Sequence, residues 1–86
     1  QKGKKIFFRF LNDKQHNIFP PENILISKDG KLSAKLFPNA SPPIGKLVEL
    51  SIILDISESQ QVVIEMIKQK GKRVTMAFDE LIIRNL

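Results

Sequence analysis

The chain has 86 residues, of which 42% are apolar, and a formal net charge of +5 at pH 7. This length and composition indicate one small globular domain over residues 1–86 and disfavour a disordered chain. Because cysteine is absent, disulfides and thiolate metal sites are excluded. No apolar run approaches the about 20 residues that span a bilayer, and no signal-peptide pattern opens the chain. Since the chain begins at Gln1 rather than Met, we expect a domain excised from a longer protein. A cytoplasmic location is also expected.

Basic residues are concentrated in the first half of the chain. Residues 1–43 hold eight Lys or Arg against three Asp or Glu, whereas residues 44–86 hold six of each. Such a basic front attracts the phosphate groups of nucleic acid, nucleotides or lipid headgroups. The alternative is a solvated face whose lysines serve only to keep the chain soluble.

The clearest strand pattern lies in residues 47–56 (LVELSIILDI). Apolar side chains recur at every second position, and mainly polar side chains occupy the other side. This alternation predicts a strand with one buried face. Ile53 interrupts the polar side, so we expect this strand to lie near the middle of a sheet. Residues 4–11 also alternate and predict a second strand or a docked extended arm.

A β-hairpin is predicted over residues 23–37. Residues 23–27 and 32–37 flank the turn Lys-Asp-Gly-Lys, in which Asp-Gly supplies the positive φ angles of a tight hairpin. Residues 15–21 end in Pro-Pro, which disfavours both a helix and a strand ladder. Residues 38–45 hold three prolines, a glycine, Asn and Ser, and this composition predicts a loop.

Residues 58–70 fit two structures. The apolar pattern matches one face of a helix beginning at Ser57 and ending at Gly71. The alternation and the run of β-branched residues instead match a strand, joined by Lys70-Gly71 to another strand over residues 73–78. The strand is favoured, with the helix as the alternative. Residues 79–86 predict a short C-terminal helix, with Asp79 as its N-cap.

These elements add up to an all-β fold. We expect a small antiparallel six-stranded barrel or roll with a short C-terminal helix, because closure removes the exposed edges of a small sheet. An α+β fold is the alternative if residues 58–70 are helical.

Catalytic and metal-binding residues are scarce, which predicts a protein that is not an enzyme. His16 is the single histidine, and without cysteine a nucleophile–base pair has few candidates. The adjacent Asp79-Glu80 is explained as a helix N-terminus rather than a metal site. The four glycines are scattered, so no phosphate-cradling loop is present, and no cofactor is expected.

Four residues are the candidates for ligand binding. Lys5 and Arg9 place two cations four residues apart beside phenylalanine rings, and a guanidinium group can both pair with phosphate and stack on a base. Asn39 and Ser41 offer an amide and a hydroxyl for the edge of a base. The structural alternatives are that Arg9 flanks a core face and that Asn39 and Ser41 only form a turn.

Residues 5–9 and 39–45 together resemble the motif of the PilZ domain family, whose members are small six-stranded barrels ending in a helix. Lys5-Ile-Phe-Phe-Arg9 is similar to the family's Arg-x-x-x-Arg, with Lys in the leading position. Residues 39–45 (NASPPIG) are similar to Asp/Asn-x-Ser-x-x-Gly, with the glycine one residue late. A rival registration places residues 27–30 on Ser-x-x-Gly. Residues 74–81 are also similar to the family's closing strand and the start of its helix.

The resemblance implies a bacterial signalling module that binds cyclic di-GMP. Lys5 and Arg9 would meet its phosphates and guanine, and Asn39 and Ser41 would hold a guanine edge. A ligand-free variant that docks a protein partner is the other form the resemblance allows.

Two other function classes fit the residues. The first is a nucleic-acid-binding small barrel of the oligonucleotide-binding or Sm-like kind, with Phe7, Phe8 or Phe10 as stacking platforms. The second is a structural interaction domain of a larger protein, with an apolar or edge surface exposed in the isolated chain.

Overall fold

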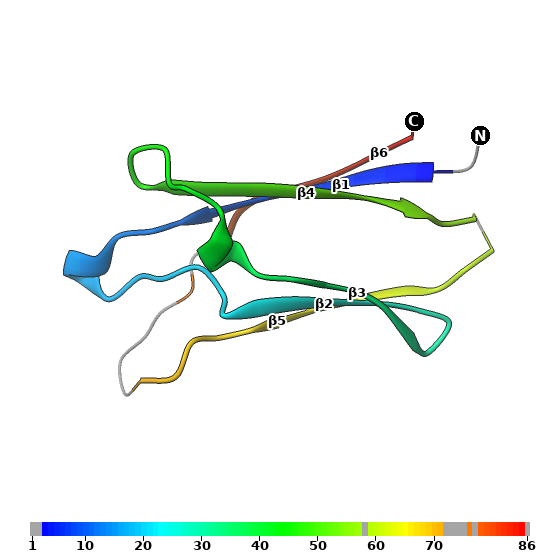
Figure 1. Cartoon of the computed structure of the whole chain (residues 1–86), viewed down its shortest axis with the longest axis horizontal. Coiled ribbons are helices and arrows are strands. Elements are labelled where there is room, and N and C mark those ends of the chain that lie inside the picture. Colours follow the sequence, from blue (N-terminus) through cyan, green and yellow to red (C-terminus); the bar gives the residue numbers. More distant parts are fainter. Residues whose placement is uncertain (1–2, 58, 72–75, 77, 86) are drawn as a thin grey trace.

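The computed structural model describes residues 3–57, 59–71, 76 and 78–85, and the fold within these residues is all-β, as predicted. Two three-stranded antiparallel sheets form two layers (Figure 1). The first sheet has the order β4-β1-β6, and the second has the order β3-β2-β5. The strands are β1 (Gly3–Leu11), β2 (Asn23–Lys28), β3 (Lys31–Leu36), β4 (Leu47–Asp55), β5 (Val62–Ile67) and β6 (Phe78–Asn85). Two 3-10 turns, η1 (Lys14–His16) and η2 (Pro38–Ala40), lie in the connections.

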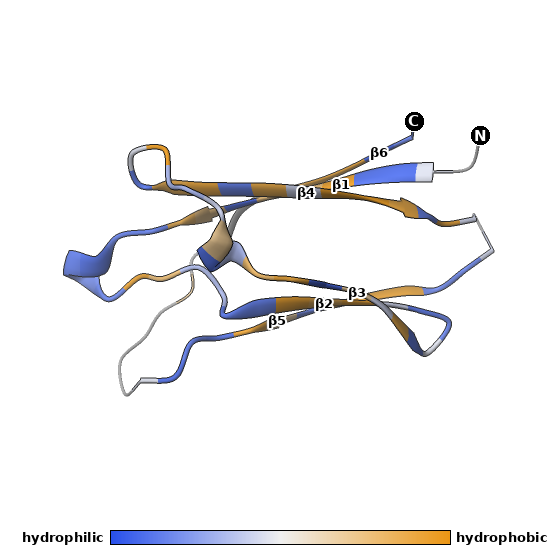
Figure 2. Ribbon diagram, viewed as in Figure 1, coloured by the Kyte–Doolittle hydropathy of each residue, from blue (hydrophilic) through white to orange (hydrophobic). Residues whose placement is uncertain are grey.

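The core lies between the two layers. Ile6, Phe8 and Phe10 of β1 and Ile24 and Ile26 of β2 are all 0% exposed. Apolar and polar residues alternate along the strands (Figure 2), which gives each sheet one face that packs against the other sheet. Two packed faces of this kind can hide the apolar area on which a small domain depends.

The prediction that residues 47–56 form a central strand was wrong. These residues form β4, an edge strand, and Ile53 on its outer face is 61% exposed. The central strand of this sheet is β1, which pairs with β4 on one side and β6 on the other. One-faced alternation shows that a strand is half-buried, but it does not reveal how many neighbours the strand has.

The predicted hairpin is confirmed as β2 and β3. Their turn has positive φ at both central residues, 50° at Asp29 and 83° at Gly30, as a type I′ turn requires. The 62–67 stretch is also a strand, so the helical alternative is wrong. This strand, β5, pairs with β2. The strand predicted over residues 73–78, which was to form a hairpin with it, lies mostly outside the described residues.

Two further predictions are corrected. Where a C-terminal helix was expected, Phe78–Asn85 forms β6, in register with β1. Consecutive Ile82 and Ile83 favour a strand, and the open edge of β1 supplies its ladder partner. The sheets are also not closed into a barrel, because each has two edge strands. Among the described residues, no helix has the length and apolar character needed to cross a membrane.

Candidate functional site

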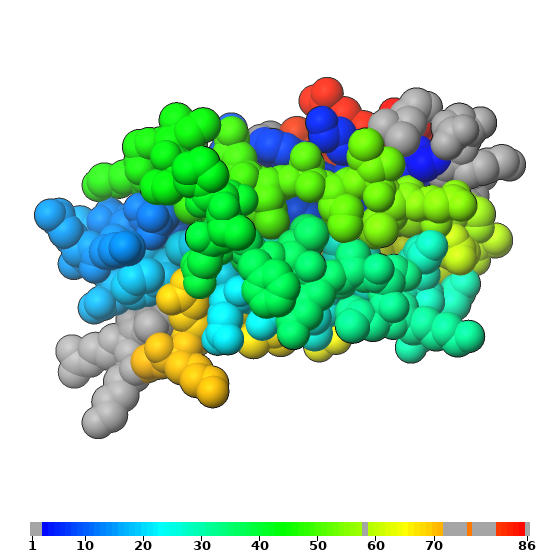
Figure 3. Space-filling view, in the orientation of Figure 1, coloured from blue at the N-terminus to red at the C-terminus, as the bar shows by residue number. Residues whose placement is uncertain are grey.

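A polar cavity of about 370 Å³, here called the loop-end pocket, lies where three connections meet. Residues from 12–20 form one wall, residues from 38–43 form another, and Gln69 closes it from the end of β5. Figures 1 and 3 show these segments gathered at the same end of the molecule. The pairing of β5 with β2 brings Gln69 here, because it sets residue 67 beside residue 23.

The amide candidate Asn39 and the hydroxyl candidate Ser41 both line the loop-end pocket. Asn39 lies in η2 and Ser41 follows it, where the backbone N–H of Ser41 donates to the carbonyl of Pro38 at 3.0 Å. The Gln69 side chain donates through Nε2 to Asn39 Oδ1 at 3.3 Å and to the Pro20 carbonyl at 3.1 Å. These bonds hold two amides in place, and preorganised amides suit the donor and acceptor edge of a nucleobase.

The first connection adds groups that were not among the predicted site residues. Asn12 contributes a third amide, Lys14 a cation, and Phe19 an aromatic ring to the lining. Asn12, Asp13 and Lys14 are residue types typical of a turn and carry no functional pattern of their own. Gln69 gave no signal because its approach depends on sheet pairing. A cation and a ring beside three amides can contact the phosphate, the base face and the base edge of a nucleotide.

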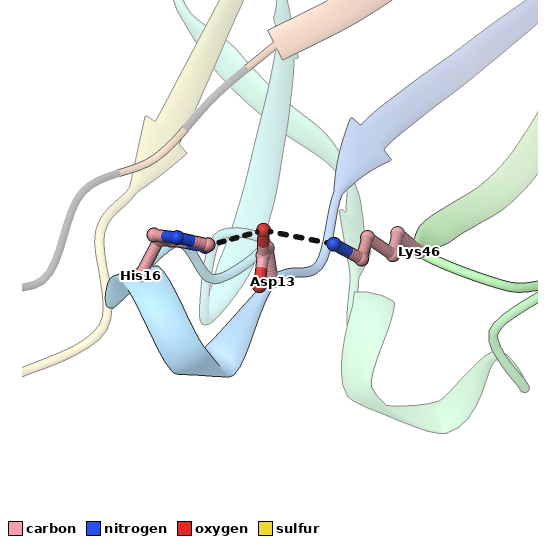
Figure 4. Close-up of polar contacts among 3 residues, drawn as sticks. All are labelled: Asp13, His16 and Lys46. Atoms are coloured by element: carbon pink, nitrogen blue, oxygen red, sulfur yellow. Dashed lines mark hydrogen bonds and ion pairs between the residues drawn. The ribbon is translucent and has the colours of Figure 1, made fainter.

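A carboxylate anchors this connection (Figure 4). Asp13 Oδ2 accepts a hydrogen bond from His16 Nδ1 at 2.8 Å and another from Lys46 Nζ at 3.3 Å. The bond from His16, and then the bond from Lys46, hold the pKa of Asp13 below its ordinary 3.8, against the opposing effect of desolvation. The Asp13 backbone also exchanges hydrogen bonds with Ile18, so the connection folds back on itself.

A second, smaller hollow lies on the outer face of the β4-β1-β6 sheet. This outer-face groove has a volume of about 220 Å³ and is lined by Lys5, Phe7, Ile82 and Arg84. Lys5 and Phe7 alternate with the buried residues of β1, and strand register sets Ile82 beside Phe7 and Arg84 beside Lys5. Two cations therefore lie side by side, one strand step of two residues from a partly exposed aromatic ring.

Arg9 lies on this same outer face but has an acidic neighbour. Its Nη1 atom lies 3.6 Å from Glu49 Oε2, and Glu49 is the register partner of Arg9 on β4. A carboxylate at this distance competes with a phosphate for the guanidinium group. The structural alternative, in which Arg9 flanks a core face, describes this position well.

The two predicted halves of the motif do not meet in one cavity. Asn39 and Ser41 share the loop-end pocket, whereas Lys5 lines the outer-face groove and Arg9 lies farther along the same strand face. Of the three suggested stacking platforms, Phe8 and Phe10 are fully buried, with ring centroids 6.3 Å apart. Phe7 is the ring of these three that a ligand can reach.

The described residues contain no group of three His, Asp or Glu side chains arranged to hold a metal ion. Comparisons with protein-family models, curated proteins and solved structures gave no match.

Proposed function

We propose that the protein is a non-enzymatic nucleotide-binding module whose base-recognition site is the loop-end pocket. The observation that carries the proposal is the convergence of Asn39, Ser41 and Gln69 with Lys14 in one cavity. The amides and the hydroxyl match the edge of a guanine, and Lys14 provides a counter-charge for a phosphate.

Cyclic di-GMP is the ligand that we propose, in the cytoplasmic bacterial signalling role implied by the resemblance to PilZ domains. Asn39 and Ser41 are the positions where that resemblance and the cavity agree. Lys5 and Arg9, the other half of the motif, are proposed as contacts to the distal part of the ligand. The closed barrel and terminal helix of that family are not present in the described residues, so the resemblance here rests on the motif positions.

The absence of catalysis is part of the proposal. The imidazole of His16 is hydrogen-bonded to Asp13 in a turn, and the lining of the loop-end pocket does not include His16. Because the described lining residues include no nucleophile–base pair, the groups that converge there can bind a ligand but are poorly suited to cleave it.

Calorimetric titration with cyclic di-GMP tests the proposal. We expect micromolar binding that weakens by about tenfold or more in Asn39→Ala and in Lys14→Ala. Lys31→Ala is the matched control, since it removes the same charge from an exposed hairpin position. Lys5→Ala and Arg9→Ala then measure the contribution of the other motif half.

Two results would contradict the proposal. Equal losses in Lys14→Ala and Lys31→Ala would mean that only net charge matters and that the loop-end pocket is not the site. No heat at about 1 mM ligand would remove the receptor function, since weaker binding has little regulatory use. The protein-docking form of the module would then be the favoured one.

A second candidate function, nucleic-acid binding, is favoured by the outer-face groove. Phe7 lies there next to the paired cations Lys5 and Arg84, an arrangement suited to stacking a base while pairing its phosphates. The test is fluorescence anisotropy with a short single-stranded oligonucleotide at several salt concentrations. We expect affinity to fall steeply with salt and to fall in Phe7→Ala but not in Phe37→Ala, which removes an exposed ring elsewhere. Salt-independent or absent binding would exclude this function.

A further inference from the structure

Strand β6 is an edge strand that carries exposed apolar side chains. It pairs with β1 on one side, and no described strand pairs with its other side. Leu81 and Ile83 share the inner face with Phe8 and Ile6, yet they are 39% and 51% exposed. The core cluster packs residues of β4 and β5 around β1 and β2 but includes neither Leu81 nor Ile83. The second sheet therefore leaves the inner-face residues Leu81 and Ile83 partly open to solvent.

We propose that this edge pairs with the β6 edge of a second copy of the chain. Placing Ile82 on a two-fold axis in an antiparallel pair sets Leu81 opposite the second copy's Ile83, and position 80 opposite position 84. The sequence has Glu at position 80 and Arg at position 84, so each charge meets its opposite twice in the dimer. A two-fold interface requires this kind of self-complementarity.

The proposed dimer has three structural consequences for β6. It provides ladder partners for the backbone groups along the free edge of β6. It packs the exposed Leu81 and Ile83 as cross-strand pairs on one face of a continuous six-stranded sheet. The second sheets of the two copies lie on the same side of that sheet, and the exposure of Leu81 and Ile83 leaves room between them for the pairing.

The other edges do not fit a second copy as well. On β4, η2 packs against the strand and Lys28 Nζ donates to the Asp55 carbonyl at 2.7 Å. Self-pairing of β3 about Ser33 would set Lys31 against Lys35, and two like charges repel each other. Self-pairing of β5 would place Glu65 opposite another Glu65 or an apolar residue, depending on the register. The β6 edge combines apolar exposure with matched charges.

Charge reversal tests the dimer and its register. We expect the protein to be a dimer by sedimentation equilibrium, and we expect Arg84→Glu and Glu80→Arg each to be monomeric because like charges then meet twice. The double variant Glu80→Arg/Arg84→Glu restores opposite pairs and should dimerise again. An equimolar mixture of the two single variants should also form a heterodimer, a result that a folding defect would not produce.

Several outcomes would overturn the proposal. A protein that remains monomeric at about 1 mM would show that another segment or partner occupies the β6 edge, or that nothing does. A dimer that persists unchanged in both single variants would place the interface elsewhere. Circular dichroism and urea unfolding of each variant confirm that the altered chains remain folded, so that monomers report on the interface.

Discussion

The Lys28 ammonium group donates a hydrogen bond to the backbone carbonyl of Asp55, with 2.7 Å between Nζ and O. Lys28 ends β2 in one sheet and Asp55 ends β4 in the other, so the bond joins the two layers. It lies at the opposite end of the sandwich from the loop-end pocket, which is next to the starts of β2 and β4. A side chain from the hairpin thus links the sheets at one end, while the connections link them at the other.

Replacing Lys28 should loosen this link. We expect Lys28→Met to lower the free energy of unfolding by about 0.5–1.5 kcal/mol, the net value of one hydrogen bond, because the aliphatic part of the side chain is kept. Urea unfolding measures the change. Lys31→Met, at an exposed position on the same hairpin, should change stability much less. Equal effects would show that the bond to Asp55 contributes nothing.

The two faces of β1 should respond differently to truncation. Phe8 is fully buried between the sheets, so Phe8→Ala should cost about 3–5 kcal/mol, a large share of the about 5–15 kcal/mol that stabilises a typical domain. Phe7, on the outer face, should cost clearly less when changed to Ala. Urea unfolding followed by circular dichroism compares the two variants. A larger loss for Phe7→Ala would reverse the assigned faces of β1.

The hairpin turn should depend on glycine. Gly30 has φ of +83°, and a Cβ added there would meet nothing within 4 Å, so the cost of a side chain is one of backbone conformation. We expect Gly30→Ala to destabilise by about 1–2 kcal/mol, measured by thermal or urea unfolding. Gly30→Asn should cost less, because Asn enters the left-handed region more readily. If Ala and Asn cost the same, the left-handed backbone is not the cause.

The turn anchored by Asp13 should weaken in acid. Because the pKa of Asp13 is lowered in the folded state, mainly by the hydrogen bond from His16, its contribution to stability is present above the unfolded value near 3.8. That contribution is lost as the pH falls through the lower, folded pKa. The difference in unfolding free energy between the protein and Asp13→Asn should therefore shrink as the solution is acidified.

A titration of the Asp13 carboxyl carbon by NMR gives a direct check. In His16→Gln, which removes the imidazole and its charged form, we expect the pKa of Asp13 to rise toward 3.8. Lys46→Met should raise it by a smaller amount, since the bond from Lys46 is the longer of the two. A pKa of Asp13 that does not respond to His16→Gln would contradict the assigned cause.

Local pattern was enough to predict much of the fold. Alternation marked β1, β4 and β5 as strands, and Asp29-Gly30 located the hairpin turn, because pleating and turn geometry depend on neighbours a few residues apart. The same reasoning placed Asn39 and Ser41 in a loop, where the structure has η2 and its exit.

Pairing between distant segments was beyond the reach of that pattern. Residues 79–85 became a strand because β1 offers an edge in register, and β4 became an edge strand because its second side has no described strand partner. Gln69 reaches Asn39 only because β5 pairs with β2, while Lys5 and Asn39 line different cavities because they extend from different faces and connections. The alternation along a strand shows which of its faces is buried. Which strands lie next to it depends on long-range contacts, and these form only when the whole chain folds.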